Sequence, residues 1–203
     1  MGESPRARRR GQGPLPGRTL AILCVALAVL TWAGSLFRSG FSYDDREAIF
    51  DNPVVNGSAA LTEAFRRDYW HHLGDAGHYR PLATVTLRLD HALHGESAVG
   101  YHLTNVALHA AVVALGAFCL LRLGGGRAAP LLGLAVFAMH PALADSVAWI
   151  SGRTSMVSAL GGTFALAAAI RFVERPAVLG VLVGLGIFVG LGGKEDAVIF
   201  ALP

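Results

Sequence analysis

Long apolar segments recur along this chain and constrain its fold more than any other feature. They cover approximately residues 19–37, 100–121, 128–140, 154–170 and 177–193. A helix needs roughly 20 mostly apolar residues to cross the hydrocarbon core of a bilayer. Of the 203 residues, 53% are hydrophobic and only 15% are charged, whereas a soluble domain of this size needs more polar surface. We predict an all-α membrane protein, a polytopic bundle of transmembrane helices.

A further apolar segment begins at Ala197, and the sequence ends at Pro203 before that segment is long enough to cross a bilayer. We interpret it as the start of a sixth span, and we expect a bundle that is truncated at its C-terminus. Residues 1–18 are rich in proline, glycine and arginine. They are predicted to form a disordered cytoplasmic tail ahead of a transmembrane domain at 19–203.

Arginines predict the orientation, because Lys and Arg accumulate on the cytoplasmic side of a membrane. We therefore place the N-terminus in the cytoplasm and the loop at 38–99 on the periplasmic, or otherwise extracytoplasmic, side of the cell inner membrane. The arginines before the first span explain most of the net charge of +3, so nucleic acid is not expected as a partner. The arginines that predict the orientation are Arg6, Arg8, Arg9, Arg10 and Arg18 before the first span, Arg122 and Arg127 after the second, and Arg171 and Arg175 after the fourth.

The first span and the cysteines each admit another interpretation. A basic start and small residues at Ala33 to Ser35 also fit a cleaved signal peptide. The apolar stretch is long for that and further spans follow, which favours an uncleaved anchor. Cys24 and Cys119 both lie in apolar spans, so we expect packing residues rather than a disulfide or a thiolate metal site.

The outer loop is predicted to carry helices along the membrane surface. Leu61, Phe65 and Tyr69 recur every four residues between 58 and 70, a spacing typical of an amphipathic helix. Another such helix is predicted to begin near Pro81, because proline suits a first helical turn. Together these helices would cover a groove between protein and lipid, and such a groove suits an amphiphilic substrate.

The adjacent carboxylates Asp44 and Asp45 lie shortly after the first span. Beside a bilayer they indicate acid/base chemistry on a lipid-borne substrate, because a positioned carboxylate takes up the proton of an attacking hydroxyl. Neighbouring side chains of an extended segment point to opposite sides. We therefore expect Asp44 to face the acceptor and Asp45 to hold a helix end, an arginine or a cation. The alternative is a solvated turn that begins a helix at Glu47.

Polar side chains also mark the second span. His102, Asn105 and His109 share one helical face, and polar groups at that depth seldom face lipid. They fit either a substrate path or hydrogen bonds between helices. We expect His102 to touch a sugar or phosphate, and Asn105 and His109 to hold neighbouring helices. Zinc would need a third ligand.

Charged groups at the outer ends of the later spans complete the candidate site. Arg153 and Arg80 suit a donor phosphate, because a guanidinium can bind two phosphate oxygens at once. Their alternative role is to bind lipid headgroups. The remaining candidates are His140 and Asp145, as acceptor contacts or structural polar groups, and Lys194 and Glu195, as a charged hinge or part of the donor site.

Several sequence blocks follow one another in order from Phe41 onward. They read YDDREAIFDNPVV, FRRDYW, YRPLATVTLRL, GYHLTNVALHA, HPALADSVAWISGR and GGKEDA. The series resembles the N-terminal membrane half of the polytopic C-type glycosyltransferases. Within that class it resembles bacterial relatives of the tetratricopeptide-containing transmembrane O-mannosyltransferases, which are dolichyl-phosphate-mannose protein mannosyltransferases.

The resemblance implies transfer of a hexose such as mannose from a polyprenyl-phosphate donor to a protein or other hydroxyl acceptor on the outer face. An inverting reaction with Asp44 or Asp45 as general base is expected. This chain departs from its relatives at Leu143, where they tend to have His, and at Asp145, where they tend to have Glu. No cofactor is therefore certain, and dependence on a divalent cation stays open. The alternative is a non-catalytic truncated membrane fragment or scaffold.

Overall fold

The computed structural model describes residues 16–38, 40–74, 76–124 and 128–200. Within these ranges the regular structure is helical and contains no β-strand. The predicted all-α class is therefore confirmed. Most of the predicted tail at 1–18 lies outside the described residues, and the first helix already begins at Gly17.

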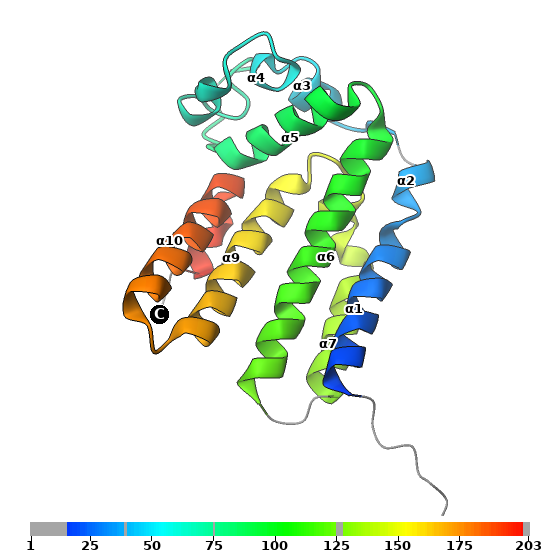
Figure 1. Cartoon of the computed structure of the whole chain (residues 1–203). Coiled ribbons are helices and arrows are strands. Elements are labelled where there is room, and N and C mark those ends of the chain that lie inside the picture. The colour runs from blue at the N-terminus through cyan, green and yellow to red at the C-terminus, as the bar shows by residue number, and fades with distance from the viewer. Residues whose placement is uncertain (1–15, 39, 75, 125–127, 201–203) are drawn as a thin grey trace, which may run out of the picture.

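Long apolar helices form the membrane bundle (Figure 1). Four segments are long and apolar enough to cross a membrane, at Gly17–Phe37, Ala98–Leu123, Arg153–Phe172 and Pro176–Gly193. The first, second, fourth and fifth predicted spans lie inside these limits, because a long aliphatic run is a local property of the sequence. The helices are α1 (Gly17–Trp32) with its short continuation α2 (Ser35–Arg38), α6 (Ala98–Leu123), α9 (Arg153–Phe172) and α10 (Pro176–Gly193).

The third predicted span, 128–140, forms a helix that is too short to cross a membrane alone. Helix α7 covers Ala128–Met139, and a helix of that length extends only about 18 Å. Pro141 then begins the turn η2 (Pro141–Leu143), which leads into α8 (Ala144–Val147). The two parts meet at a bend of 50° and together qualify as a broken span or a re-entrant loop. Proline explains the break, because it has no N–H to continue the helical ladder.

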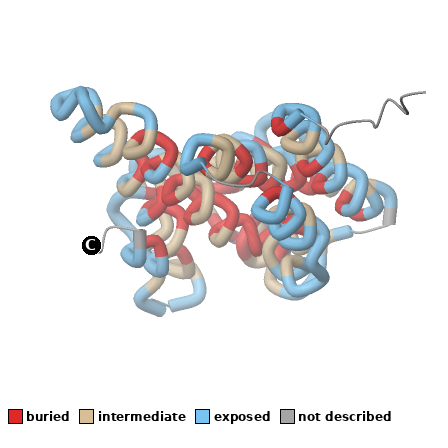
Figure 2. The backbone as a smooth tube through the Cα atoms, turned by 90° about the horizontal axis from the view of Figure 1, so that it is seen from below, coloured by how far each residue is buried: buried red, intermediate tan, exposed pale blue. Residues whose placement is uncertain are grey.

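Helices α1, α7 and α9 share α6 as a common neighbour. Helix α1 packs against α6 and α7, and α9 packs against α6 and α10. Buried residues gather where the helices face one another, while the outward surfaces are exposed (Figure 2). Leu30, Val181 and Phe188 on those surfaces are 72%, 70% and 56% exposed. Such apolar outward faces are suited to contact with lipid tails.

Glycines allow α9 and α10 to approach closely. A Cβ atom added at Gly161 of α9 would lie 2.2 Å from the backbone nitrogen of Gly190 in α10, and one added at Gly186 would lie 2.8 Å from the carbonyl oxygen of Gly161. Small residues at such a contact let two membrane helices meet backbone to backbone. The close packing of α9 against α10 therefore depends on the absence of side chains at these glycines.

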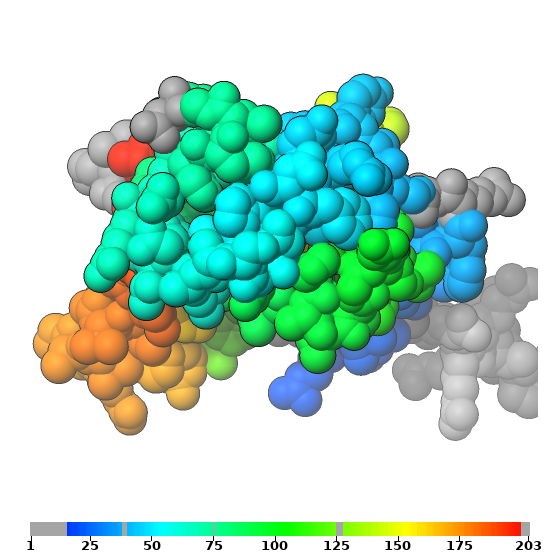
Figure 3. All heavy atoms as spheres, turned by 90° about the horizontal axis from the view of Figure 1, so that it is seen from above, coloured from blue at the N-terminus to red at the C-terminus, as the bar shows by residue number. Residues whose placement is uncertain are grey.

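An outer layer covers one end of the bundle (Figure 3). It comprises α3 (Asp45–Ile49), α4 (Pro53–Asn56), η1 (Leu61–Phe65) and α5 (Pro81–His94). The helix predicted from Pro81 is confirmed. The helix predicted over 58–70 is wrong, because only the 3-10 turn η1 forms there. The Asp68 carboxylate accepts from the backbone N–H groups of Trp70 and His78, which holds this part of the chain in a loop.

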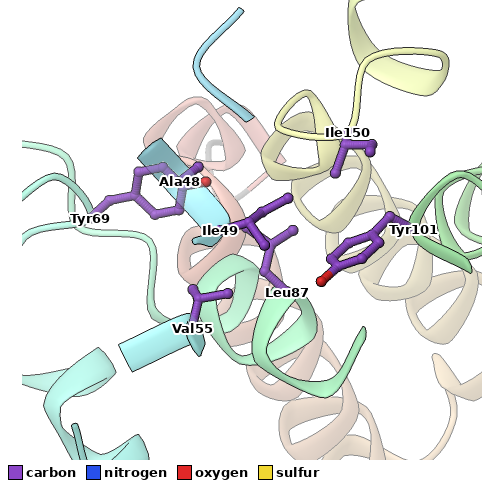
Figure 4. Close-up of a cluster of buried hydrophobic side chains, with 7 residues drawn as sticks. All are labelled: Ala48, Ile49, Val55, Tyr69, Leu87, Tyr101 and Ile150. Atoms are coloured by element: carbon purple, nitrogen blue, oxygen red, sulfur yellow. The ribbon is translucent and has the colours of Figure 1, made fainter. Parts of the chain in front are cut away.

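A buried apolar cluster joins the outer layer to the bundle (Figure 4). Ile49 of α3, Leu87 of α5, Tyr101 of α6 and Ile150, just before α9, are each fully buried and pack together. Burying a large apolar side chain stabilises a fold by about 1.5–3 kcal/mol. The cluster therefore fixes α3, and with it the acidic pair, against the outer ends of α6 and α9.

The C-terminal segment continues past α10 as the 3-10 helix η3 (Glu195–Phe200). It packs back against α9 and α10. The predicted start of a sixth span at Ala197 falls in this turn, and residues 201–203 lie outside the described part of the chain. Cys24 and Cys119 are buried and not paired with each other.

Candidate functional site

The acidic pair begins helix α3 after an unusual backbone turn. Tyr43 has φ of 51°, a left-handed conformation that is strained for a residue with a side chain. The residue is 91% exposed, and its ring forms a T-shaped contact with Trp149 at 6.0 Å between centroids. The turn places Asp44 at the N-cap position, where its side chain makes no capping hydrogen bond. A simple capping role for Asp44 is therefore not observed.

Asp45 is fully buried and holds two segments together. Its Oδ1 accepts from the backbone N–H of Ser151 at 2.9 Å and from the Ser151 hydroxyl at 2.6 Å. Its Oδ2 accepts from the backbone N–H of Ser42 at 2.9 Å. Both oxygens are thus used, and Asp45 ties α3 to the segment that precedes α9.

Asp44 has a different environment from its neighbour. Its Oδ1 is buried and accepts no hydrogen bond from any described residue. Burial raises the pKa of this carboxyl above its ordinary value of 3.8, and the nearby charges of Asp45 and Glu47 raise it further, against an opposing backbone hydrogen bond. A carboxylate with a raised pKa is a stronger base than a solvated one. Of the pair, only Asp44 has a buried carboxylate oxygen that lacks a hydrogen-bond partner among the described residues.

Arg80 lies between the outer layer and the C-terminal segment. Its guanidinium is 5.9 Å from the ring centroid of buried Tyr69. Its Nη2 is 3.1 Å from Oε1 of Glu195, in η3, and 3.1 Å from Nδ1 of His78. The hydrogen bond from Arg80 lowers the pKa of Glu195. The structure thus brings together the predicted donor residues Arg80 and Glu195.

Lys194 is the other predicted donor residue of this segment, and its side chain contacts two neighbouring polar groups. Its Nζ is 3.5 Å from Oδ2 of Asp196 and 3.5 Å from the hydroxyl of Ser155 in α9. Asp196 also accepts from the Ser158 hydroxyl at 2.8 Å. These contacts hold the end of α10 against α9. The predicted charged hinge stays a prediction.

Arg153 is fully buried, which the sequence did not indicate. Its Nη1 is 2.6 Å from Oδ2 of Asp90 in α5, and that carboxylate is itself buried. The guanidinium also donates to Oδ1 of Asn105 at 2.8 Å and to the carbonyls of Tyr101 and Thr86 at 2.9 and 3.2 Å. With these partners Arg153 joins α5, α6 and α9. The structure favours this role over the predicted contact with a donor phosphate.

The polar face of α6 points into the protein. The Asn105 amide donates to the carbonyl of Trp149 at 2.9 Å, and Nε2 of His109 is 3.0 Å from the carbonyl of Ala138 at the end of α7. Asn105 and His109 therefore take the interhelical role, one of the two that the sequence left open. His102 is also buried, and its ring nitrogens make no hydrogen bond among the described residues.

The remaining candidates lie on the surface near η2. His140 is exposed, and its Nδ1 accepts from the backbone N–H of Ala142 at 3.2 Å, which caps the turn. Asp145 is exposed as well. Across the described ranges, no hydrogen bond or ion pair links either side chain to Asp44, and no group of three or more His, Cys, Asp or Glu residues is arranged to hold a metal ion.

The sequence did not single out Tyr69 or Asp90 as site residues. Asp90 shares a helical face with Ala83 and Leu87, so its position on the buried side was detectable from their spacing. Tyr69 was assigned to the apolar face of a surface helix. It is instead only 3% exposed, and its hydroxyl lies inside the outer layer.

The chain is similar to several proteins named protein O-mannosyl-transferases. It is 36% identical to Tmtc1 of Drosophila melanogaster over 162 residues, which cover 76% of this chain and 19% of that protein. It is 33% identical to F38B6.6 of Caenorhabditis elegans over 181 residues, 85% of this chain and 25% of the relative. It is 40% identical to TMTC2 of Homo sapiens over 125 residues, which cover 59% of this chain and 15% of that protein.

The chain thus spans a quarter or less of the length of these relatives, 25% in the case of the C. elegans protein. No protein-family model matches the chain, and no solved structure matches it.

Proposed function

This chain is a relative of the TMTC-family protein O-mannosyltransferases over most of its length, and we propose that it serves mannosyl transfer. The donor in this proposal is a polyprenyl-phosphate-linked hexose such as mannose, and the acceptor is a hydroxyl group of a protein. The reaction takes place at the outer face of the cell inner membrane and inverts the anomeric carbon.

The difference between Asp44 and Asp45 carries the proposal. Asp45 has both oxygens in hydrogen bonds to the protein, whereas Asp44 has a buried oxygen without a partner among the described residues and a raised pKa, chiefly because of burial. An attacking serine or threonine hydroxyl must lose its proton, and a positioned carboxylate can accept it. Asp44 is therefore assigned as the general base and Asp45 as the residue that positions it.

Arg80 supports the donor side of the proposal. Its carboxylate partner Glu195 has a side chain that is 61% exposed, whereas the Arg80 side chain is only 13% exposed. A guanidinium held in this way can exchange a carboxylate for phosphate oxygens of similar geometry. Arg80 would steady the phosphate as charge develops on it during departure, with Lys194 and Glu195 at the edge of the same site.

The distribution of arginines supports the orientation. Arg18, Arg122, Arg171 and Arg175 lie at the end of the bundle where α1 begins and where α6 and α9 end. The outer layer lies at the opposite end. Positively charged ends tend to stay in the cytoplasm, so the acidic pair would face outward, where a lipid carrier presents its sugar.

The proposal is tested with membranes that contain the chain. They are incubated with polyprenyl phosphate carrying radiolabelled mannose and with a peptide rich in serine and threonine, with and without chelator. Label is expected in the peptide and not in a matched peptide in which alanine replaces serine and threonine. No label above that of membranes without the protein would contradict the proposal and favour a non-catalytic scaffold. Loss of label with chelator would assign a divalent cation.

A further inference from the structure

The hydroxyl group of Tyr69 is a buried polar group that the assignments above do not use. The residue is only 3% exposed, and its hydroxyl oxygen has no hydrogen-bond partner among the described residues. Leaving a buried hydroxyl unpaired is unfavourable, because the group has lost its hydrogen bonds to water and gained none in the protein. Native proteins seldom carry such a group without a reason, and a role in binding a polar ligand is one such reason.

The position of the Tyr69 ring is fixed from several sides. Its backbone N–H donates to the carbonyl of His78 at 2.7 Å, and its own carbonyl accepts from the amide of Asn52 at 3.2 Å. The edge of Trp70 lies 4.8 Å away between centroids. Figure 4 shows the ring reaching beside Ala48 of α3, with the hydroxyl pointing toward the bundle. The hydroxyl is therefore held in one place.

The charges around this hydroxyl are those of the proposed active site. Burial, and then the negative charge of Asp44, raise the pKa of Tyr69, while the Arg80 guanidinium opposes that rise. The phenol thus stays protonated at physiological pH and can donate a hydrogen bond. Asp44, whose charge acts on this phenol, has a buried oxygen that accepts no hydrogen bond from the described residues. A donor and an acceptor without partners thus lie in one buried region.

We propose that Tyr69 is a substrate-binding residue, and that its ligand is an alcohol hydroxyl bound between the Tyr69 phenol and the Asp44 carboxylate. A hydroxyl accepts one hydrogen bond and donates another, so it satisfies both groups at once. A phosphate or carboxylate has no proton to give Asp44 and would be repelled by it. The alcohol comes either from the acceptor side chain or from the sugar. The inference rests on the proposed function for the identity of the substrates.

Binding measurements test this inference without requiring turnover. The chain in lipid nanodiscs is titrated with a fluorescent peptide rich in serine and threonine and, separately, with octyl mannoside. Tyr69→Phe keeps the ring and removes only the oxygen. Loss of one hydrogen bond of about 1 kcal/mol predicts binding about fivefold weaker for one of these probes. The Tyr79→Phe variant serves as control, because the Tyr79 hydroxyl donates to the carbonyl of Phe65 on an exposed part of the same layer.

The outcomes distinguish the two sources of the alcohol. Weaker binding of the peptide alone identifies the acceptor, and weaker binding of octyl mannoside alone identifies the sugar. The inference is overturned if Tyr69→Phe binds both probes as the wild type does, or if the wild type binds neither. Binding that depends on Tyr69 without any mannose transfer would reject the proposed function and leave this inference in place.

Thermal unfolding separates a binding role from a structural one. Because the Tyr69 hydroxyl has no described partner to lose, Tyr69→Phe is expected to unfold at or above the wild-type temperature. A lower unfolding temperature together with unchanged binding would show that the hydroxyl only supports the fold.

Discussion

Asp45 and Ser151 are 106 residues apart in the chain and are joined by two hydrogen bonds, of 2.9 and 2.6 Å, to the same carboxylate oxygen. This contact connects the first turn of α3 to the segment before α9. Since Asp44 directly precedes Asp45, the geometry of the proposed base depends on a neighbour that takes no part in the chemistry.

Replacing Asp45 by Asn is therefore expected to destabilise the protein. The amide keeps the shape, but it weakens hydrogen bonds that a charged acceptor makes strong, with an expected loss of about 2–4 kcal/mol in the free energy of unfolding. Ser151→Ala removes only the hydroxyl and should cost about 1–2 kcal/mol. Denaturant unfolding in micelles measures both. Equal stability of Asp45→Asn and the wild type would contradict the positioning role.

The buried ion pair between Arg153 and Asp90 should show strong coupling. Arg153→Met leaves the Asp90 carboxylate buried without its countercharge, so a loss of about 3–5 kcal/mol is expected. Adding Asp90→Leu removes that orphaned charge and should recover at least half of the loss. A double-mutant cycle of unfolding free energies measures the coupling. Additive effects would mean that the two side chains do not form an ion pair in the protein.

Asp44 should oppose folding at neutral pH. Its folded-state pKa is raised above the ordinary value of 3.8, mainly by burial, so the ionised form favours the unfolded chain once the pH exceeds the unfolded pKa. Asp44→Asn should therefore be more stable than the wild type at about pH 7, and this advantage should disappear as the pH falls below about 4. Unfolding temperatures of both proteins, measured from about pH 4 to about pH 7, provide the test. An Asp44→Asn variant less stable than the wild type at neutral pH would contradict the expected effect of the raised pKa.

The close contact between α9 and α10 predicts opposite effects of alanine at two glycines. At Gly161 the new Cβ would meet the backbone of Gly190 at 2.2 Å, whereas at Gly184 it would meet nothing within 4 Å. Gly161→Ala should cost about 1–3 kcal/mol by forcing the helices apart, and Gly184→Ala should be neutral or stabilise by up to about 1 kcal/mol. Denaturant unfolding in micelles measures the stability of both variants. Similar effects at both sites would contradict the backbone contact.

The membrane spans were predictable because each depends on a local run of apolar residues. The four helical segments long and apolar enough to cross a membrane enclose the predicted limits. Around Pro141 the sequence also marked where the third span ends. By contrast, the residues at 58–70 carried a helical spacing but formed a loop, because the Asp68 side chain competes for backbone N–H groups.

The partners of the charged residues were not predictable in the same way. Arg153 and Asp90 lie far apart in the chain, and no local sequence pattern indicates that they form an ion pair. Arg153 was therefore assigned to a phosphate, since an isolated arginine near the outer surface suits one. The sequence suggested that Asp44 and Asp45 have different roles, but not what Asp45 binds. Its partner is Ser151, which folding brings from a distant segment.

The rate of mannosyl transfer by Asp44→Asn tests the assignment of the general base most directly. The matched control is Asp51→Asn, an exposed carboxylate of the same layer. With labelled polyprenyl-phosphate mannose and a serine- and threonine-rich peptide, Asp44→Asn should lose about 10²- to 10⁴-fold in rate, and Asp51→Asn should retain the wild-type rate. Undiminished transfer by a folded Asp44→Asn variant would contradict the role of Asp44.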